Sequence, residues 1–154
     1  MDIRKANRED VREIVRLLAD DELGSKRERN EDPLPKIYME AFEEIESQRG
    51  NEILLGVDEK EIIGCLQLTI IPGLSRQGMK RAQIEGVRVK RNVRGKKIGE
   101  ALIKEAIAYA KLEGCGIVQL TTDKQRLDAH RFYERLGFLA SHEGMKLSLE
   151  VDDE

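Results

Sequence analysis

The chain has 154 residues, of which 40% are hydrophobic, and a formal net charge of -3 at neutral pH. A chain of this size supports one hydrophobic core, so we expect a single domain over residues 1–154. No apolar run has the length of a membrane span, and the start lacks a signal-peptide core, which predicts a cytoplasmic protein without a membrane partner. The acidic balance, the lack of Trp and the 4% aromatic content argue against nucleic acid as a partner.

The two cysteines, Cys65 and Cys115, each stand alone within an apolar stretch. Neither has a second Cys or a His at the spacing of metal ligands. The sequence therefore predicts no disulfide framework and no metal site. We expect both to be buried structural thiols.

The first half of the chain predicts a strand, two helices and a hairpin. Residues 2–6 form the strand, and Asn7 with Asp10 resembles a helix N-cap. Residues 20–35 are highly charged and interrupted by Gly24 and two prolines, which favours a loop before a second helix over residues 37–45. Residues 51–57 and 61–71 have the β-branched content of a hairpin. The first helix is expected to bury Val11, Ile14, Val15, Leu17 and Leu18.

The second half begins with an alternating strand over residues 81–89. A helix over 98–114, a strand over 117–123 and a helix over 128–137 follow. Two short strands, 138–141 and 145–151, are expected at the end. The whole pattern predicts a single-domain α+β fold, α/β sandwich-like, whose mixed and mostly antiparallel central sheet has about six to seven strands flanked by about four helices.

A basic stretch joins the strand over 81–89 to the helix that follows it. Six Lys or Arg residues lie between Arg88 and Lys97, with no acidic residue among them. The first N–H groups of a helix lack intrahelical partners, so a diphosphate placed at this junction meets several donors. A solvated basic loop whose glycines satisfy turn geometry is the alternative. The residues expected to contact the anion are Arg94, Gly95, Lys96, Lys97, Ile98 and Gly99.

Together with "AHRFYERLGF" at residues 129–138, this stretch resembles the Gcn5-related N-acetyltransferase (GNAT) family. The basic loop is similar to the family's acyl-CoA pyrophosphate motif, and the order of elements matches along nearly the whole chain. Lys97 stands where the family usually has Gly. The departure is harmless if Lys97 has the negative φ of a helical first turn, and costly if the site requires a positive φ.

The resemblance implies acetyl transfer from acetyl-CoA, as cosubstrate and without a metal, to a primary amine of a small molecule or a protein. An amine with a pKa of ~10.4 must lose a proton before it attacks a thioester. Glu85 is the candidate base, directly or through water. By the strand's period of two it shares a face with Val87 and Val89, which the resemblance assigns to the pantetheine arm. The alternative is a surface glutamate paired with Arg88 or Arg81.

Three further roles follow from the resemblance. Tyr133 matches the phenol that protonates the CoA thiolate, the alternative being an amphipathic tyrosine with its hydroxyl in water. Asp123 is the reserve base, grouped with the acyl-CoA-binding residues, unless it only starts a turn. Arg126 is expected to bind phosphate, although it also suits a solvated loop. A backbone N–H near Val89 would polarise the thioester carbonyl.

The acceptor stays open at this stage. Two other function classes also remain, a non-catalytic acyl-CoA-binding regulatory module and a nucleic-acid-binding regulator. Residues 144–151 offer a strand to a partner subunit, and the resemblance favours a homodimer. Charge favours a cationic amine at Asp20, Asp21 and Glu22, and an anionic acceptor at Arg27, Arg29, Arg76 and Arg81.

Overall fold

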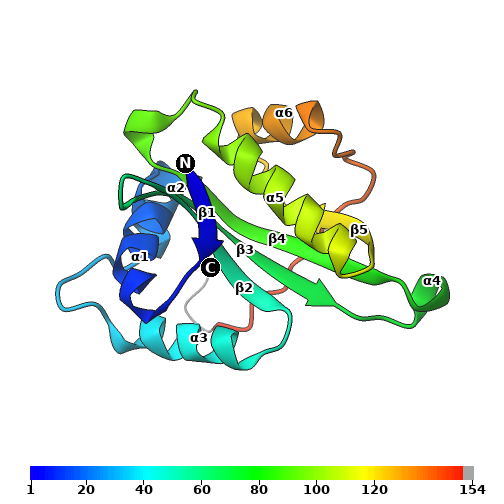
Figure 1. The fold of residues 1–154 in the computed structure, drawn as a ribbon, viewed down its shortest axis with the longest axis horizontal. Helices are drawn as coiled ribbons and strands as arrows, with labels where there is room; N and C mark the ends of the chain where they lie inside the picture. Colours follow the sequence, from blue (N-terminus) through cyan, green and yellow to red (C-terminus); the bar gives the residue numbers. More distant parts are fainter. Residues whose placement is uncertain (151–154) are drawn as a thin grey trace. The chain divides into compact units, whose positions relative to one another are not determined.

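The computed structural model describes residues 1–150. The chain forms two compact units, Met1–Leu120 and the residues from Thr121 onward. The first unit contains a mixed sheet whose five strands lie in the order β1-β2-β3-β4-β5. The first three pairings are antiparallel, and β4 pairs with β5 in parallel. Figure 1 shows these strands, β1 (Asp2–Lys5), β2 (Asn51–Asp58), β3 (Glu61–Ile71), β4 (Lys80–Val89) and β5 (Cys115–Leu120).

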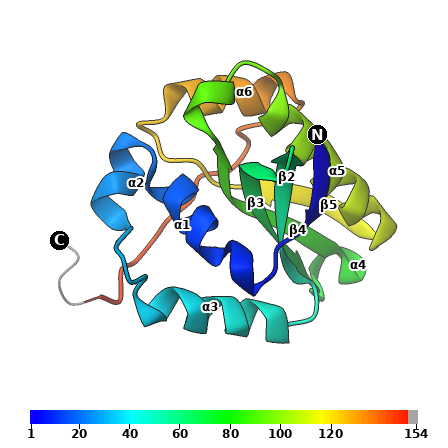
Figure 2. The same cartoon turned by 60° about the vertical axis from the view of Figure 1, so that its left-hand side comes forward.

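Helices cover both faces of this sheet. In Figure 2, α1 (Val11–Ala19) and α3 (Lys36–Ser47) lie on one side, and α5 (Ile98–Leu112) lies on the other. The short helix α2 (Glu22–Arg27) follows α1, and the turn α4 (Ser75–Gly78) joins β3 to β4. The second unit contains α6 (Leu127–Arg135).

Two consecutive residues of β3 show how the sheet separates the two layers. Cys65 packs with Ile14 and Leu17 of α1. The adjacent Gly64 faces α5, where a Cβ would lie 2.9 Å from Leu102. Because neighbouring side chains of a strand point to opposite faces, both sides of the sheet are buried.

Most of the expected elements are confirmed. Asn7 accepts a hydrogen bond from the Glu9 N–H and forms a capping box with Asp10, although this box caps a 3-10 turn just before α1. The hairpin β2–β3 closes at Glu59 and Lys60, which both have positive φ, as a type I′ turn requires. The described part of the chain contains no helix that combines the length and apolar character needed to span a bilayer.

The loop expected over residues 20–35 was wrong in its first part, because α2 forms there. Asp21 is the N-cap of α2, and its side chain accepts a hydrogen bond from the Gly24 N–H. Gly24 is buried, and a Cβ on it would lie 2.0 Å from the carbonyl oxygen of Leu18. The glycine is therefore required by helix packing and does not mark a loop.

The strand and helix numbers also differ from expectation. Residues 1–150 hold five strands and six α-helices, two of which are very short. The expected strands over 138–141 and 145–150 are not formed, and the last residue of the second, Val151, lies outside the described residues. Cys65 is buried as expected, but Cys115 is only half-buried.

Candidate functional site

The candidate site begins where β4 and β5 separate. Their parallel register runs from Lys80 to Ile84 on β4 and ends there. Among the described residues, the part of β4 from Glu85 to Val89 therefore has no β5 partner. Backbone groups on this side of β4 are open to a ligand.

Val89 directs its backbone groups to this open side. The next N–H along the chain, that of Lys90, donates to the carbonyl oxygen of Ile63 in β3 at 2.8 Å. Because these directions alternate along a strand, the N–H and C=O groups of Val89 point away from β3. The Val89 carbonyl accepts a hydrogen bond from Nε of Arg94 at 3.3 Å. The Val89 N–H faces the same side.

The basic loop leads directly into the N terminus of α5. A 3-10 turn over Arg91–Val93 follows β4, and Gly95 has φ of 88°. No side-chain hydrogen bond caps α5 in the described structure, so its first N–H groups remain available. Ile98, the first residue of α5, has a buried side chain with 8% exposure, which leaves its backbone N–H as the group for the expected contact.

Of the two alternatives for Lys97, the structure has the one with positive φ. Lys97 has φ of 61° and ψ of 26°, in the left-handed region, immediately before α5. The loop therefore needs the conformation that glycine adopts most easily, and Lys97 holds it under strain. Strain of this kind often lies at ligand-binding sites.

The prediction that Glu85 and Val89 share a face of the sheet was wrong, because β4 contains a bulge. Cys65 lies opposite Arg88, whereas Gln67 lies opposite Glu85, so β4 has an extra residue between these pairs. Directly opposed residues share a face. Glu85 therefore lies on the same face as Arg88, and Val89 lies on the face toward α5. Simple alternation could not reveal this, although Gly86, with φ of 60°, marks the position.

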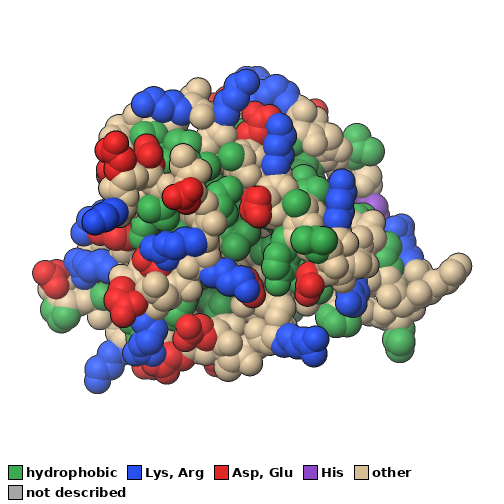
Figure 3. Space-filling model, viewed as in Figure 1, with side chains coloured by type: hydrophobic (Ala, Val, Ile, Leu, Met, Phe, Trp, Pro, Cys, Tyr) green, Lys and Arg blue, Asp and Glu red, His purple; other side chains and the backbone are tan. Residues whose placement is uncertain are grey.

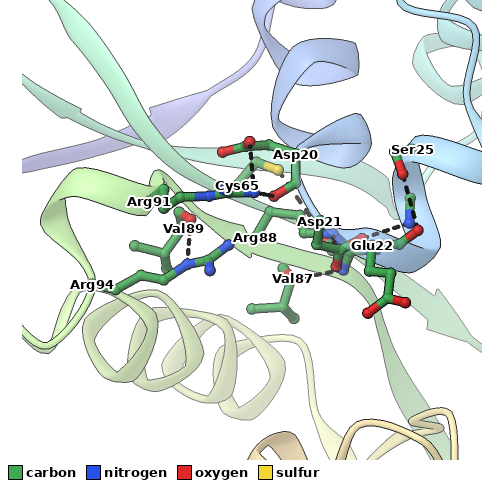
Figure 4. A network of polar contacts seen from close by, with 12 residues as sticks. Asp20, Asp21, Glu22, Ser25, Cys65, Val87, Arg88, Val89, Arg91 and Arg94 are labelled. Atoms are coloured by element: carbon green, nitrogen blue, oxygen red, sulfur yellow. Dashed lines mark hydrogen bonds and ion pairs between the residues drawn. The ribbon is translucent and has the colours of Figure 1, made fainter.

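Two ion pairs connect the end of α1 to the basic stretch, as Figure 4 shows. Oδ1 of Asp20 lies 3.2 Å from Arg91, and Oδ2 of Asp21 lies 3.7 Å from Nε of Arg88. The side chains of Arg88 and Asp21 are each 19% exposed. Sequence reasoning missed both pairs because the partners are about seventy positions apart. Two of the three carboxylates considered as attracting a cationic amine, Asp20 and Asp21, are thus paired with arginines.

Charges are mixed elsewhere on the first unit. On the face drawn in Figure 3, acidic and basic side chains are interspersed over α1 and α3. Ion pairs account for part of this mixture, including Arg8 with Glu43 at 2.8 Å and Arg16 with Glu13 at 2.7 Å.

The second unit holds the other three candidate residues. Tyr133 is half-buried, and its ring packs edge-on against Phe132 at 5.1 Å and Phe138 at 5.8 Å between centroids. Oδ1 of Asp123 accepts a hydrogen bond from the Gln125 N–H at 2.9 Å, which is the turn role considered as its alternative. Arg126 is the half-buried N-cap residue of α6.

Burial disfavours the thiolate form of both cysteines. Burial raises the pKa of Cys65 to about 12, although the nearby Arg88 opposes the shift. Burial also raises the pKa of Cys115. Across residues 1–150, no group of three or more His, Cys, Asp or Glu side chains is arranged to hold a metal ion.

In this α+β domain, the basic loop leads into the uncapped N terminus of α5, next to the point where β4 and β5 separate. This arrangement suits a ligand that carries phosphate. Comparison with known proteins specifies the family. The model of the acetyltransferase (GNAT) family matches residues 12–138, and the chain belongs to this family.

The similar proteins carry names for different activities. The structure of a transcriptional regulator from Bacillus halodurans C-125 is 52% identical, with a TM-score of 0.93, and the match covers 96% of this chain and 98% of that one. Glucosamine 6-phosphate N-acetyltransferase of Trypanosoma brucei brucei is 36% identical over 88 residues, which are 57% of this chain and 58% of that protein. Aminoalkylphosphonate N-acetyltransferase of Salmonella typhimurium is 44% identical over 50 residues, 32% of each chain. The matches thus span between about a third and somewhat more than half of these two curated relatives.

Proposed function

We propose that this protein is an acetyl-CoA-dependent N-acetyltransferase that acetylates the primary amine of a small molecule carrying an anionic group. The observation that carries the proposal is the left-handed turn at Gly95 and Lys97, which leads into the uncapped N terminus of α5. Membership of the acetyltransferase (GNAT) family agrees with it.

The loop suits the CoA pyrophosphate. Gly95, Lys96 and Lys97 are exposed, so a diphosphate has access to their backbone N–H groups and to two ammonium groups. A Cβ on Gly95 would meet no atom within 4 Å, so its glycine serves the backbone conformation and not packing. Arg94 adds a guanidinium group, which suits phosphate oxygens. These residues would hold the cosubstrate, which supplies the activated acetyl group.

The open side of β4 suits the remainder of the cosubstrate. The Val89 N–H points to the side where β5 no longer pairs, so it is a candidate donor to the thioester carbonyl. Val87 belongs to the same open segment and is the second candidate contact of the pantetheine arm.

Glu85 remains the proposed base and Tyr133 the proposed acid. Glu85 is exposed, so it can accept a proton through solvent water, which suits a carboxylate too weak to deprotonate the amine alone. Tyr133 is proposed to protonate the CoA thiolate on the strength of the motif over residues 129–138. Asp123 and Arg126 stay proposed as acyl-CoA-binding residues, with the Asp123 turn as a competing role.

The ion pairs weaken the case for a polyamine acceptor. Asp20 and Asp21 are paired with arginines, so little of their charge remains to attract a second cation. Two relatives are named for amines that carry a phosphate or phosphonate group. We therefore infer an acceptor of this chemical class.

The test is calorimetric titration of the full chain with acetyl-CoA, followed by a thiol-release assay. We expect binding in the micromolar range, about -8 kcal/mol, that weakens at least tenfold in Arg94→Ala/Lys97→Gly but not in Lys111→Ala, a control at the far end of α5. Turnover with an amino sugar phosphate or an aminoalkylphosphonate should exceed turnover with a polyamine. Tyr133→Phe should lower kcat and leave acetyl-CoA affinity unchanged.

Two results would oppose the proposal in different ways. Absence of acetyl-CoA binding would reject the cosubstrate and every assigned role. Binding without turnover on any amine would support a regulatory acyl-CoA-binding module. Full turnover in Tyr133→Phe would show that Tyr133 does not take part in the chemistry.

A second candidate function is transcriptional regulation, because the 52% identical relative bears that name over nearly its full length. The test is titration of duplex DNA at several salt concentrations. A regulator that binds DNA directly should lose affinity steeply with salt, because phosphate contacts release counterions. Salt-independent or absent DNA binding would leave the enzyme as the better candidate.

A further inference from the structure

A cavity lies at the edge of the sheet, past the point where β1 ends. The pairing of β1 with β2 stops at Lys5 and Leu54, after which the chain leaves the sheet toward α1. β2 begins at Asn51, so its first residues extend beyond this pairing. Figures 1 and 2 both show the end of β1 between α3 and α5. The cavity there has a volume of about 530 Å³, which is in the range of small-molecule sites.

The cavity is separate from the candidate site for acetyl-CoA. Its lining includes the end of α3 and, from α5, Tyr109 with Glu113 just past the helix. The basic loop lies at the other end of α5, and a helix of 15 residues is about 22 Å long. No lining residue belongs to β4 or to the basic loop, and all belong to the first unit. A ligand here would leave the proposed cosubstrate position free.

Ionisable side chains from separate elements meet at this cavity. Nζ of Lys5 lies 2.9 Å from Oε1 of Glu52. The other oxygen, Oε2 of Glu52, is buried and has no hydrogen-bond partner within residues 1–150. Burial raises the pKa of the Tyr109 hydroxyl, and the charges of Glu52 and Glu113 raise it further. The cluster therefore lacks one hydrogen-bond donor, and a buried acceptor without a donor is costly.

The lining of the cavity favours a cation. It carries three carboxylates and two cations, namely Glu46, Glu52, Glu113, Lys5 and Arg49. α3 and α5 both end at the cavity, and the C-terminal end of a helix carries partial negative charge. The ring of Tyr109 can attract a cation to its face. Phe42, with 4% exposure, adds an apolar wall. This lining suits an ammonium group on a short carbon chain.

We propose that this cavity binds an organic cation with a primary ammonium group, held by Glu52 and Glu113 and by the ring of Tyr109. The ammonium group supplies the donor that Oε2 of Glu52 lacks. Lys5 competes for the same carboxylate, and its 65% exposed side chain can move into water to admit the ligand. Binding requires neither acetyl-CoA nor turnover, so the proposal stands or fails independently of the proposed function.

The experiment is titration of the isotopically labelled full chain with n-butylamine at neutral pH, without acetyl-CoA, followed through the backbone amide signals. We expect saturable shifts at Gly50, Asn51 and Glu113, and none at Val87 or Val89. n-Butanol has the same carbon chain without the charge and should give no saturable shift. Shifts confined to Val87 and Val89 would place the amine at the acceptor site and overturn the proposal. Equal responses to the amine and the alcohol would also overturn it.

Variants of the lining should change the affinity in opposite directions. Glu52→Gln keeps the shape of the side chain without its charge and should weaken n-butylamine binding at least tenfold. Glu113→Gln, at an exposed position that leaves the core intact, should weaken it at least threefold. Lys5→Gln removes the competing ammonium group and should strengthen it at least threefold. Glu43→Gln, on α3 but outside the cavity, is the matched control and should have no effect. Weaker binding in Lys5→Gln, or unchanged binding in both Glu52→Gln and Glu113→Gln, would reject the site.

Discussion

Replacing Lys97 by glycine and by alanine separates the strain of the basic loop from its charge. At φ of 61° and ψ of 26°, a residue with a Cβ costs roughly 1–2 kcal/mol. Both variants lose the same ammonium group, but only glycine removes the Cβ. Glycine also lowers the free energy of unfolding by about 0.5–1 kcal/mol, because it gives the unfolded chain more conformational freedom than alanine does. We therefore expect Lys97→Gly to be more stable than Lys97→Ala by about 0.5–1 kcal/mol.

Lys96 provides the matched control. It is exposed, carries the same charge and does not have a positive φ. There the order should reverse, with the glycine variant about 0.5–1 kcal/mol less stable than the alanine variant. Urea unfolding at one protein concentration measures both differences, which correspond to midpoint shifts of about 0.3–0.5 M in opposite directions. Equal midpoints for the two Lys97 variants would refute the left-handed conformation.

The ligand side of this prediction is independent of stability. Lys97→Gly and Lys97→Ala both remove one cation from the loop, so they should weaken acetyl-CoA binding by the same factor. A tighter complex with glycine than with alanine would mean that the ligand requires a different backbone conformation from the one in this structure. Titration calorimetry on the two variants distinguishes these outcomes.

The remaining predictions concern stability and reactivity. Gly24→Ala should destabilise the protein by about 3 kcal/mol, because the new Cβ would lie 2.0 Å from a carbonyl oxygen of α1, as denaturant midpoints would show. Cys115 should react with a thiol reagent in the folded protein, and Cys65 only after unfolding; simultaneous labelling would contradict this. Two hydrogen bonds from Arg4 hold the pKa of Asp10 below its usual value, so their stabilisation is present above the unfolded pKa and disappears as the pH falls through the lower folded pKa. Asp10→Asn should therefore cost about 1 kcal/mol at pH 7, a value discounted for the half-exposed Arg4, and progressively less below about pH 4; a loss independent of pH would refute the role of the charge.

Local patterns predicted the elements well, and long-range contacts explain what they could not predict. The apolar period of α1 and α5 and the turn residues of the β2–β3 hairpin are local signals, and these elements formed as expected. The bulge at Gly86 shifts the register by one residue, which no period-two argument can locate. α2 was missed because Gly24 was read as a breaker, although Asp21 three residues before it is a good N-cap.

The site shows the same division. The motif placed the loop correctly at the start of α5, but the sign of φ at Lys97 depends on how the loop closes over several residues. The face of Glu85 depends on a bulge, and the pairing of Asp20 and Asp21 depends on partners far along the chain. The backbone conformation of the loop and the pairing of its charges therefore depend on tertiary contacts, which residue spacing in the sequence does not predict.

The structure divides the six cations between Arg88 and Lys97 into two groups with different roles. Toward the strand, Arg88 and Arg91 pair with the carboxylates at the end of α1, and Lys90 pairs with Glu61. Their charges are paired with carboxylates at the end of α1 and in β3, and these pairs hold the end of β4 in place. Toward the helix, the exposed residues Arg94, Lys96 and Lys97 carry the charge that a ligand meets. Three cations on one tight turn suit a compact diphosphate better than a long polyanion, since a DNA site limited to them would show a salt slope of only about -3. The local excess of charge therefore favours a nucleotide-like cosubstrate.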